Sequence, residues 1–232
     1  MKNNQLPAYI KLTLAIIGWA GVYHSANYLV HKVDLYTVAF VRYFCASIIL
    51  VTIMKIKRGY IFDVKLFKAH WWILINLGVV GIGIYNLVFF LSEKYLPASM
   101  IALIFSITPC LTALMSSIYF RKRISIAAYL SLLVALSGAV GVINYSNPQC
   151  NQYWCNPITH LSFGEISTFA LCILSATFSI MSRVASSKNI DSLTITTYAA
   201  VFGTIVLFIT MLFAGHPQDL LVQDQTFWLV MA

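Results

Sequence analysis

Long apolar stretches, separated by short polar turns, divide most of the chain. Each holds about 20 residues, the length at which an α-helix rising ~1.5 Å per residue crosses a hydrocarbon core ~30 Å thick. They cover residues 12–30, 35–54, 71–91, 96–120, 124–143, 163–182 and 190–213. A last apolar run at 227–232 is too short to cross a membrane. The pattern predicts an all-α polytopic membrane protein with seven complete transmembrane helices plus the start of an eighth.

The stretch at 96–120 contains no charged residue and stops at the basic residues 121–123. Pro97 suits the first turn of a helix, where its missing N–H is not needed. Pro109 falls in the middle of the stretch, where it removes one main-chain hydrogen bond, so we expect a kink halfway through the membrane. Transporters of small molecules often place their sites at such breaks.

Composition and charge agree with a membrane location. Hydrophobic residues make up 60% of the 232 residues and charged residues 9%, whereas in a soluble domain roughly a quarter of all residues are charged. The net charge is +8, but Lys and Arg gather in the turns at 55–68 and 121–123, on one side of the predicted spans. Such a one-sided distribution sets orientation and does not indicate nucleic-acid binding. We therefore expect a multi-pass protein of the bacterial inner (plasma) membrane, in contact with the lipid bilayer, with a cytoplasmic N-terminus and no nucleic-acid partner.

A weak internal repeat relates two parts of the chain. A shift of 157 positions places residues 34–38 on residues 191–195 and Trp71 on Trp228. Five spans precede the long polar segment at 144–162, and because five is odd, the second set of spans starts from the opposite side. This predicts an inverted repeat of five-helix halves, a design that secondary transporters use. We assign residues 1–146 to the first repeat, 147–162 to an outer loop and 163–232 to an incomplete second repeat, cut about 70 residues short.

Several motifs resemble those of the EamA-type proteins of the drug/metabolite transporter superfamily. They are Trp19 followed 23 residues later by Arg42, the segment 94–99 with its continuation to Thr108 and Pro109, and the pair Ser137 and Gly138. The resemblance implies ten spans in two inverted five-helix halves, both termini in the cytoplasm, and movement of small metabolites across the inner membrane. Members usually have Trp-Gly where this chain has Trp19 and Ala20, and Gly-Glu-Arg where it has residues 121–123.

Arg42 interrupts the second apolar stretch, roughly 10 Å below the outer surface at ~1.5 Å per residue. A guanidinium at this depth is costly and usually faces a cavity or a partner. One hypothesis is that Arg42 binds a substrate carboxylate or joins a gating pair. The alternative is that it reaches the outer interface and has a structural partner such as Glu93.

Polar residues on one face of the first span are typical of a pore wall. Trp19, Tyr23, His24 and Asn27 fall on adjacent rows of that helix. A histidine at this depth lines a polar cavity or relays a proton, or else it is hydrogen-bonded between helices. We expect this face and Arg42 to share a central cavity, with the kink of the fourth span as its far wall.

Asn86 lies on one stripe of the third span with Gly83, Phe90 and Glu93, and it contacts either substrate or another helix. Glu93 itself is more typical of a solvated charge at the rim. The candidate substrate-binding or pore-lining residues are Trp19, Tyr23, His24, Asn27, Arg42, Asn86 and Pro109.

Other features are more typical of structure than of chemistry. Cys150 and Cys155 lie in the predicted outer loop, where an oxidising compartment favours a disulfide. Two cysteines without a nearby histidine pair fall short of four metal ligands, so we expect no metal site. Glu165 begins the sixth span, where a carboxylate stabilises a helix N-terminus. Ser175 and Ser179 share one face of that span, as in helix packing.

Two functions fit these observations. We expect a secondary transporter (permease) that moves a small polar or amphipathic metabolite, amino-acid-like or drug-like, by alternating access. The alternative is a non-transporting membrane protein, either an assembly partner or an inactive truncated remnant of a carrier. No nucleophile–base pair recurs at helical spacing and no phosphate-binding loop is present, so we expect neither an enzyme nor an ATP-driven pump, and no cofactor. A homodimer is compatible with the pattern.

Overall fold

The described chain is helical. The computed structural model describes residues 6–121, 125–146, 162–223 and 225–231. The α-helices are α1 (Leu6–Val30), α2 (Leu35–Arg58), α3 (Val64–Gly78), α4 (Tyr85–Tyr95), α5 (Ala98–Phe105), α6 (Thr108–Phe120), α7 (Ile126–Ser146), α8 (Phe163–Ser187), α9 (Ser192–Ala214) and α10 (Gln225–Met231). The π-helix η1 (Val79–Ile84) joins α3 to α4, and the 3-10 helix η3 (Pro217–Val222) follows α9. No strand occurs in these ranges, which confirms the all-α prediction.

Five helical stretches of the described chain are long and apolar enough to cross a membrane. They are Leu35–Arg58, Val64–Tyr95, Ala98–Phe120, Phe163–Ser187 and Ser192–Ala214. A polytopic membrane protein is thereby confirmed. The two other predicted spans correspond to α1 and α7, and the predicted start of an eighth corresponds to α10. The total of seven spans and the inverted repeat stay predictions.

The predicted kink of the fourth span is present, two residues before Pro109. There α5 ends and α6 begins with Pro109 in its first turn. The Ser106 N–H donates to the Leu103 carbonyl at 3.3 Å, and the Ile107 N–H donates to the Ile104 carbonyl at 3.2 Å. The chain therefore tightens into a short 3-10 turn ahead of the proline, because a proline is tolerated in the first turn of a new helix.

Helix ends are set by capping residues rather than by the limits of the apolar stretches. Asp63 accepts hydrogen bonds from the N–H groups at the start of α3, which begins seven residues before the predicted span at 71–91. Ser162 and Glu165 form a capping box at the start of α8, which confirms the structural role predicted for Glu165. Much of the basic segment predicted as a loop at 55–70 therefore lies on helix ends.

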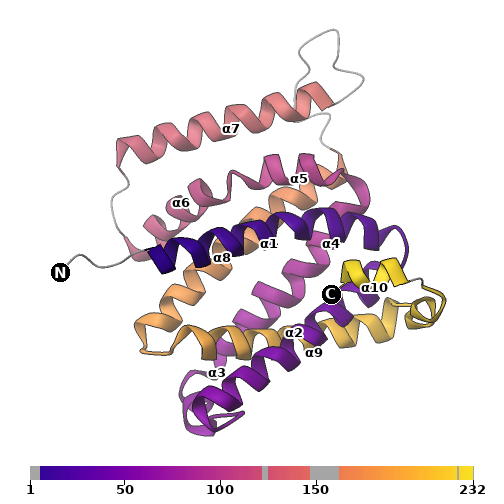
Figure 1. Cartoon of the computed structure of the whole chain (residues 1–232). Helices are drawn as coiled ribbons and strands as arrows, with labels where there is room; N and C mark the ends of the chain where they lie inside the picture. The colour runs from indigo at the N-terminus through magenta and orange to yellow at the C-terminus, as the bar shows by residue number, and fades with distance from the viewer. Residues whose placement is uncertain (1–5, 122–124, 147–161, 224, 232) are drawn as a thin grey trace.

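The helices α2 and α9 pack against each other in antiparallel orientation (Figure 1). Arg58 at the end of α2 forms a salt bridge of 3.1 Å with Asp191, which caps the start of α9. At their other ends, the His216 N–H donates to an Asp34 carboxylate oxygen at 2.9 Å. Midway, the hydroxyls of Ser47 and Thr204 are 2.7 Å apart.

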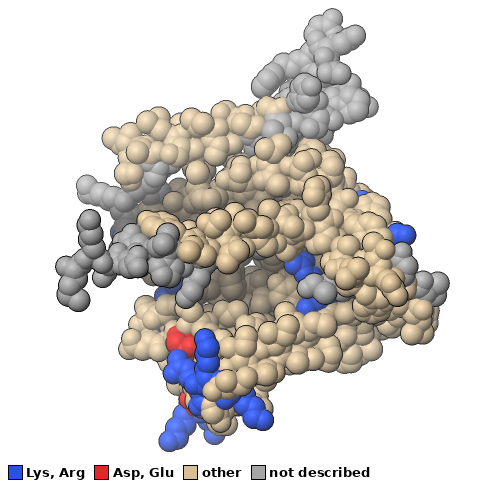
Figure 2. Space-filling view, viewed as in Figure 1, with Lys and Arg blue, Asp and Glu red and all other residues tan. Residues whose placement is uncertain are grey.

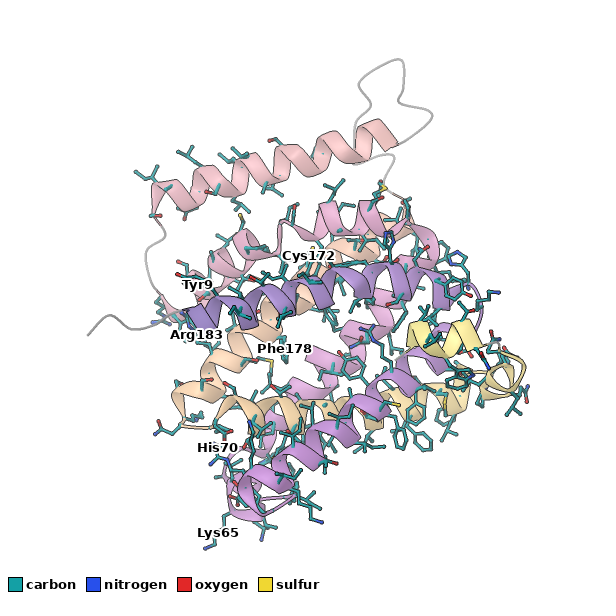
Figure 3. The ribbon with its side chains drawn as sticks, in the orientation of Figure 1. Tyr9, Lys65, His70, Cys172, Phe178 and Arg183 are labelled. Carbon is teal, nitrogen blue, oxygen red and sulfur yellow. The ribbon has the colours of Figure 1, made fainter. Side chains whose placement is uncertain are left out.

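These contacts define two ends of the molecule. The basic end holds the turns at 59–63 and 188–191. Figure 2 shows Lys and Arg gathered at this end, at the bottom of the view. Lys65 points away from the helices there (Figure 3). The sealed end holds the turns at 31–34, 96–97 and 215–216. Its name comes from a buried apolar cluster beside these turns.

This sealed cluster joins α1, α2, α4, α5, α8, α9 and α10. Its buried members are Ala26, Leu29, Val30, Val33, Leu35, Val38, Ala39, Phe89, Phe90, Ile101, Leu171, Leu207 and Phe227. In contrast, α7 lies at the margin of the bundle against α5 and α6, and most of its described side chains are exposed (Figure 1). The core that positions the site is therefore built without α7.

Candidate functional site

A cavity of about 480 Å³ lies between α2, η1, α4, α8 and α9. Figure 2 shows the molecule hollowed between its helices on the viewed face. The lining residues are Arg42, Tyr43, Ala46, Leu50, Gly81, Ile82, Tyr85, Ser175, Phe178, Ser179, Thr196 and Ala200. On α2 and α8 these residues lie near the middle of the helix, so the cavity is central along the bundle. Its volume falls within the range of small-molecule sites, roughly 300–1,000 Å³.

A second cavity of about 40 Å³ lies beside the first, between α1, α2 and α4. Its lining residues are Val22, Tyr23, Arg42, Tyr43, Tyr85, Asn86 and Phe89. Arg42, Tyr43 and Tyr85 border both cavities. The Phe89 ring fixes two tyrosines here, because it stacks on Tyr85 at 6.4 Å and meets Tyr23 edge-on at 5.5 Å.

Arg42 has no counter-ion in the described part of the chain. The Arg58–Asp191 pair is the salt bridge that forms there, so the Arg42–Glu93 pair considered above is absent. The phenols of Tyr43 and Tyr85 are the polar neighbours of the guanidinium. A partly buried guanidinium without a carboxylate therefore faces both cavities.

The acidic residues are engaged elsewhere. Four of them take part in helix caps, namely Asp34, Asp63, Glu165 and Asp191. A fifth, Asp219, is exposed in η3. Glu93 is buried in α4 beside α1, and Asp224 lies outside the described residues. None of the described acidic side chains lines either cavity. The described walls thus carry a positive charge and no negative one.

Glycines explain the shape of the cavity wall at η1. A Cβ on Gly81 would lie 2.0 Å from the ring of Phe178, so the missing side chain lets that ring pack on the helix (Phe178 is labelled in Figure 3). A Cβ on Gly203 of α9 would lie 2.5 Å from Ile82 and 3.0 Å from the Gly78 carbonyl. This close approach holds η1 against α9. π-Helical turns are frequent at functional sites, and here the turn forms part of the wall.

The predicted site residues fall into three groups. Arg42, Tyr23 and Asn86 border the cavities. His24 and Pro109 are exposed, and neither lines a cavity. In the third group, Asn27 makes an interhelical contact, while the Trp19 side chain and the cysteine pair lie outside the described part of the structure.

Asn27 makes an interhelical contact instead of facing a cavity. Its amide donates to the main-chain carbonyl of Glu93 at 3.0 Å and lies 3.5 Å from that of Leu96, which ties α1 to the turn after α4. The Trp19 side chain lies outside the described part of the structure, as do Cys150 and Cys155, so their predicted roles stay predictions.

Glu93 corrects the sequence-based interpretation of a solvated rim charge. Its side chain is 1% exposed, and neither carboxyl oxygen has a hydrogen-bond partner. The stripe formed with Gly83, Asn86 and Phe90 is buried throughout, so the stripe was predicted correctly while the exposure of its last member was not. Glu93 is covered because α1 folds over it, which the local sequence of α4 does not reveal.

Most residues of the cavity wall were not predicted from the sequence. Tyr43, Tyr85 and Phe178 were not distinguished from other apolar or aromatic positions. Ser175 and Ser179 were assigned to helix packing, yet both line the main cavity. Their common face on α8 was the available signal.

The sequence pattern of the EamA-like transporter family matches residues 6–144, which is more than half of the chain. The chain belongs to this family. The match covers α1 to α6 and most of α7, so α8 and α9, which complete the cavity, come from outside the matched stretch.

Several similar proteins share a modest identity with the chain. The uncharacterized transporter YetK of Bacillus subtilis is 22% identical over 97% of this chain and 66% of its own length. An uncharacterized transporter of Archaeoglobus fulgidus is 24% identical over 86% of this chain and 66% of its own length. The uncharacterized transporter YrdR of Bacillus subtilis is 30% identical over 63% of this chain and 46% of its own length. The chain thus spans 66% of the length of the first two relatives. No solved structure matches the chain.

Proposed function

We propose that the protein is a secondary transporter that moves a small polar or amphipathic metabolite, amino-acid-like or drug-like, by alternating access. The observation that carries this proposal is the central cavity of about 480 Å³ with the unpaired guanidinium of Arg42 on its wall. Family membership supports the class of function. Secondary transporters place their sites near the bilayer midplane, where irregular helices line a cavity, as η1 does here.

The contacts between α2 and α9 support the inverted repeat. The repeat shift of 157 positions pairs Asp34 with Asp191 and Ser47 with Thr204. Both aspartates cap their helices, and Ser47 and Thr204 touch each other near the middle of the pair. Equivalent residues contact each other where they lie on a two-fold axis. An axis at Ser47–Thr204 relates the Arg58–Asp191 contact to the contact of Asp34 with the residue after Gly215.

In this proposal the two ends open in turn. We infer that the sealed cluster acts as the closed gate at one end, and that substrate enters or leaves at the basic end. The excess of Lys and Arg supports a cytoplasmic position for the basic end in a bacterial cell, with the N-terminus on the same side.

Uptake into liposomes tests the proposed transport. The protein, as its gene encodes it, is reconstituted and offered a ¹³C-labelled metabolite extract, and the retained compounds are identified by mass spectrometry. We expect a small set of labelled metabolites to be retained, and Arg42→Gln to abolish retention. Lys32→Gln is the matched control, because Lys32 is exposed and borders neither cavity. Equal contents in liposomes with and without protein would instead favour a non-transporting membrane protein.

A further inference from the structure

The charge of the cavity limits the range of substrates that the proposed transporter accepts. This inference rests on the proposed function. Arg42 is the charged residue on the described walls of both cavities. It has no salt-bridge partner among the described residues, whose acidic side chains cap helices, lie in η3 or are buried beside α1. A partly buried guanidinium favours an anionic partner, and its planar fork matches a carboxylate.

The rest of the wall is apolar and aromatic. Tyr43, Tyr85 and Phe178 present rings from three different helices, and Leu50 and Ile82 add aliphatic surface. Stacking on Phe89 holds the Tyr85 ring in place, and Gly81 lets the Phe178 ring lie against η1. Such walls favour a ligand with a flat apolar body, because burial of apolar surface stabilises the complex.

Hydroxyl groups supply the remaining polarity. Ser179 donates its hydroxyl proton to the Ser175 carbonyl at 2.9 Å, so its oxygen retains lone pairs that face the cavity. Thr196 contributes a further hydroxyl from α9. These groups accommodate an uncharged polar substituent, but they do not neutralise an ammonium group. An α-ammonium would lose water here without gaining a carboxylate partner, which is unfavourable.

We propose that the cavity selects an organic monocarboxylate with a flat apolar body, and that it discriminates against amines and against zwitterionic amino acids of the same shape. The carboxylate pairs with Arg42, and the body lies among Tyr43, Tyr85 and Phe178. Within the broader class of polar or amphipathic metabolites, the substrate is an organic acid without an ammonium group.

Four probes that share one carbon skeleton test the selection. Hydrocinnamate carries the carboxylate alone, L-phenylalanine adds an ammonium group, phenylpropylamine carries the ammonium alone, and hydrocinnamyl alcohol is neutral. Binding to the purified protein in lipid nanodiscs is measured by isothermal titration calorimetry. We expect the affinity for hydrocinnamate to be at least about tenfold higher than that for each of the other three probes.

Variants test whether Arg42 is responsible for the selectivity. Arg42→Gln should remove the preference for hydrocinnamate over the alcohol, and Arg42→Lys should keep part of it because the charge remains without the fork. Lys32→Gln, an exposed cation outside both cavities, should leave all four affinities unchanged. The probe series on the unaltered protein is decisive by itself if Arg42→Gln does not fold.

Three results would overturn the selection of an anion. These are tighter binding of phenylalanine or the amine than of hydrocinnamate, an equal loss of all four affinities in Arg42→Gln, and no binding of any probe. Each leaves the transport proposal intact if labelled metabolites still enter the liposomes. Conversely, selective binding of hydrocinnamate without any uptake would contradict transport while supporting an anion site.

Discussion

Each end of the α2–α9 pair is joined by a helix-capping aspartate, but the two aspartates make different contacts with the other helix. At the basic end, Asp191 pairs with the Arg58 side chain at 3.1 Å, with the two side chains 38% and 44% exposed. At the sealed end, Asp34 accepts hydrogen bonds from the main-chain N–H groups of Tyr36, Thr37 and His216. An exposed salt bridge contributes little, about 0–1 kcal/mol, whereas main-chain hydrogen bonds to a carboxylate persist without ordering a long side chain.

Packing strengthens the difference between the ends. The sealed cluster includes Val33 and Leu35, which flank Asp34, and it packs against the cavity residues Tyr43 and Tyr85. We infer that the basic end separates at lower cost and that opening the sealed end limits the conformational cycle. The following predictions test this comparison, from the largest expected effect to the smallest.

Phe90→Ala should destabilise the protein most. Phe90 is fully buried in the sealed cluster, so its truncation leaves a cavity and costs about 3–5 kcal/mol. Phe213→Ala is the matched control, because Phe213 is 88% exposed on α9. Thermal unfolding in one detergent measures both. Similar shifts of Tm for the two variants would mean that the sealed cluster is not a packed core.

Gly203→Ala should destabilise by about 1–3 kcal/mol, since the new methyl group meets Ile82 and the Gly78 carbonyl with little room to move. Gly138→Ala, where the structure shows open space around the new Cβ, is the control and should be neutral or slightly stabilising. Thermal unfolding again gives the comparison. A neutral Gly203→Ala would show that η1 and α9 are not held in close contact.

Glu93→Met should raise stability by roughly 1–3 kcal/mol, because it replaces a buried carboxyl without hydrogen-bond partners by an apolar side chain of similar length. Asp191→Met at the basic end should lower stability, since that carboxylate is hydrogen-bonded. Tm values of the two variants, measured together, decide the point. A loss of stability in Glu93→Met would reveal a partner for Glu93 in the folded state.

The smallest effect concerns Asp191. Burial acts to raise the pKa of Asp191, but hydrogen bonds from Thr194 and the charge of Arg58 outweigh it and hold that pKa below the usual value. A lowered pKa stabilises the fold above the normal pKa of an aspartate, about 3.9, and the contribution is lost as pH falls through the folded value. Asp191→Ala should cost about 1 kcal/mol at neutral pH, mostly through the lost cap.

The pH dependence of that variant separates the two contributions. The difference in Tm between the protein and Asp191→Ala should shrink as the pH is lowered below about 4. Arg58→Gln keeps the cap and removes the ion pair, so it should lower Tm by less than Asp191→Ala does. A difference that stays constant down to pH 3 would show that the charge of Asp191 does not contribute.

The sequence predicted most of the fold and only part of the site. Apolar length predicts membrane helices without reference to tertiary contacts, and Pro109 marked the break between α5 and α6 because its chemistry is local. Arg42 could be identified because a charge in an apolar stretch needs a special environment. Its neighbours Tyr43, Tyr85 and Phe178 could not, since an aromatic side chain suits a lipid face, a core and a cavity wall equally well.

Burial of single polar residues also depends on distant segments. His24 and Asn27 share a face of α1, yet His24 is exposed and Asn27 bonds to the last turn of α4, because the rotation of α1 is set by packing. Glu93 is buried for the same reason. The π-helix η1 was not anticipated, although Gly78, Gly81 and Gly83 mark the place where α9 and Phe178 approach the backbone.

Access to the central cavity from both ends is the most direct test of alternating access. In a variant without the native cysteines, Ser179→Cys places a thiol on the cavity wall, and an impermeant thiol reagent is applied to right-side-out and inside-out membrane vesicles. Ser187→Cys, exposed at the end of α8, is the control that reacts from one side only. We predict that the thiol at position 179 reacts in both kinds of vesicle. Reaction from one side alone, under every condition in which labelled metabolites cross the membrane, would contradict the account.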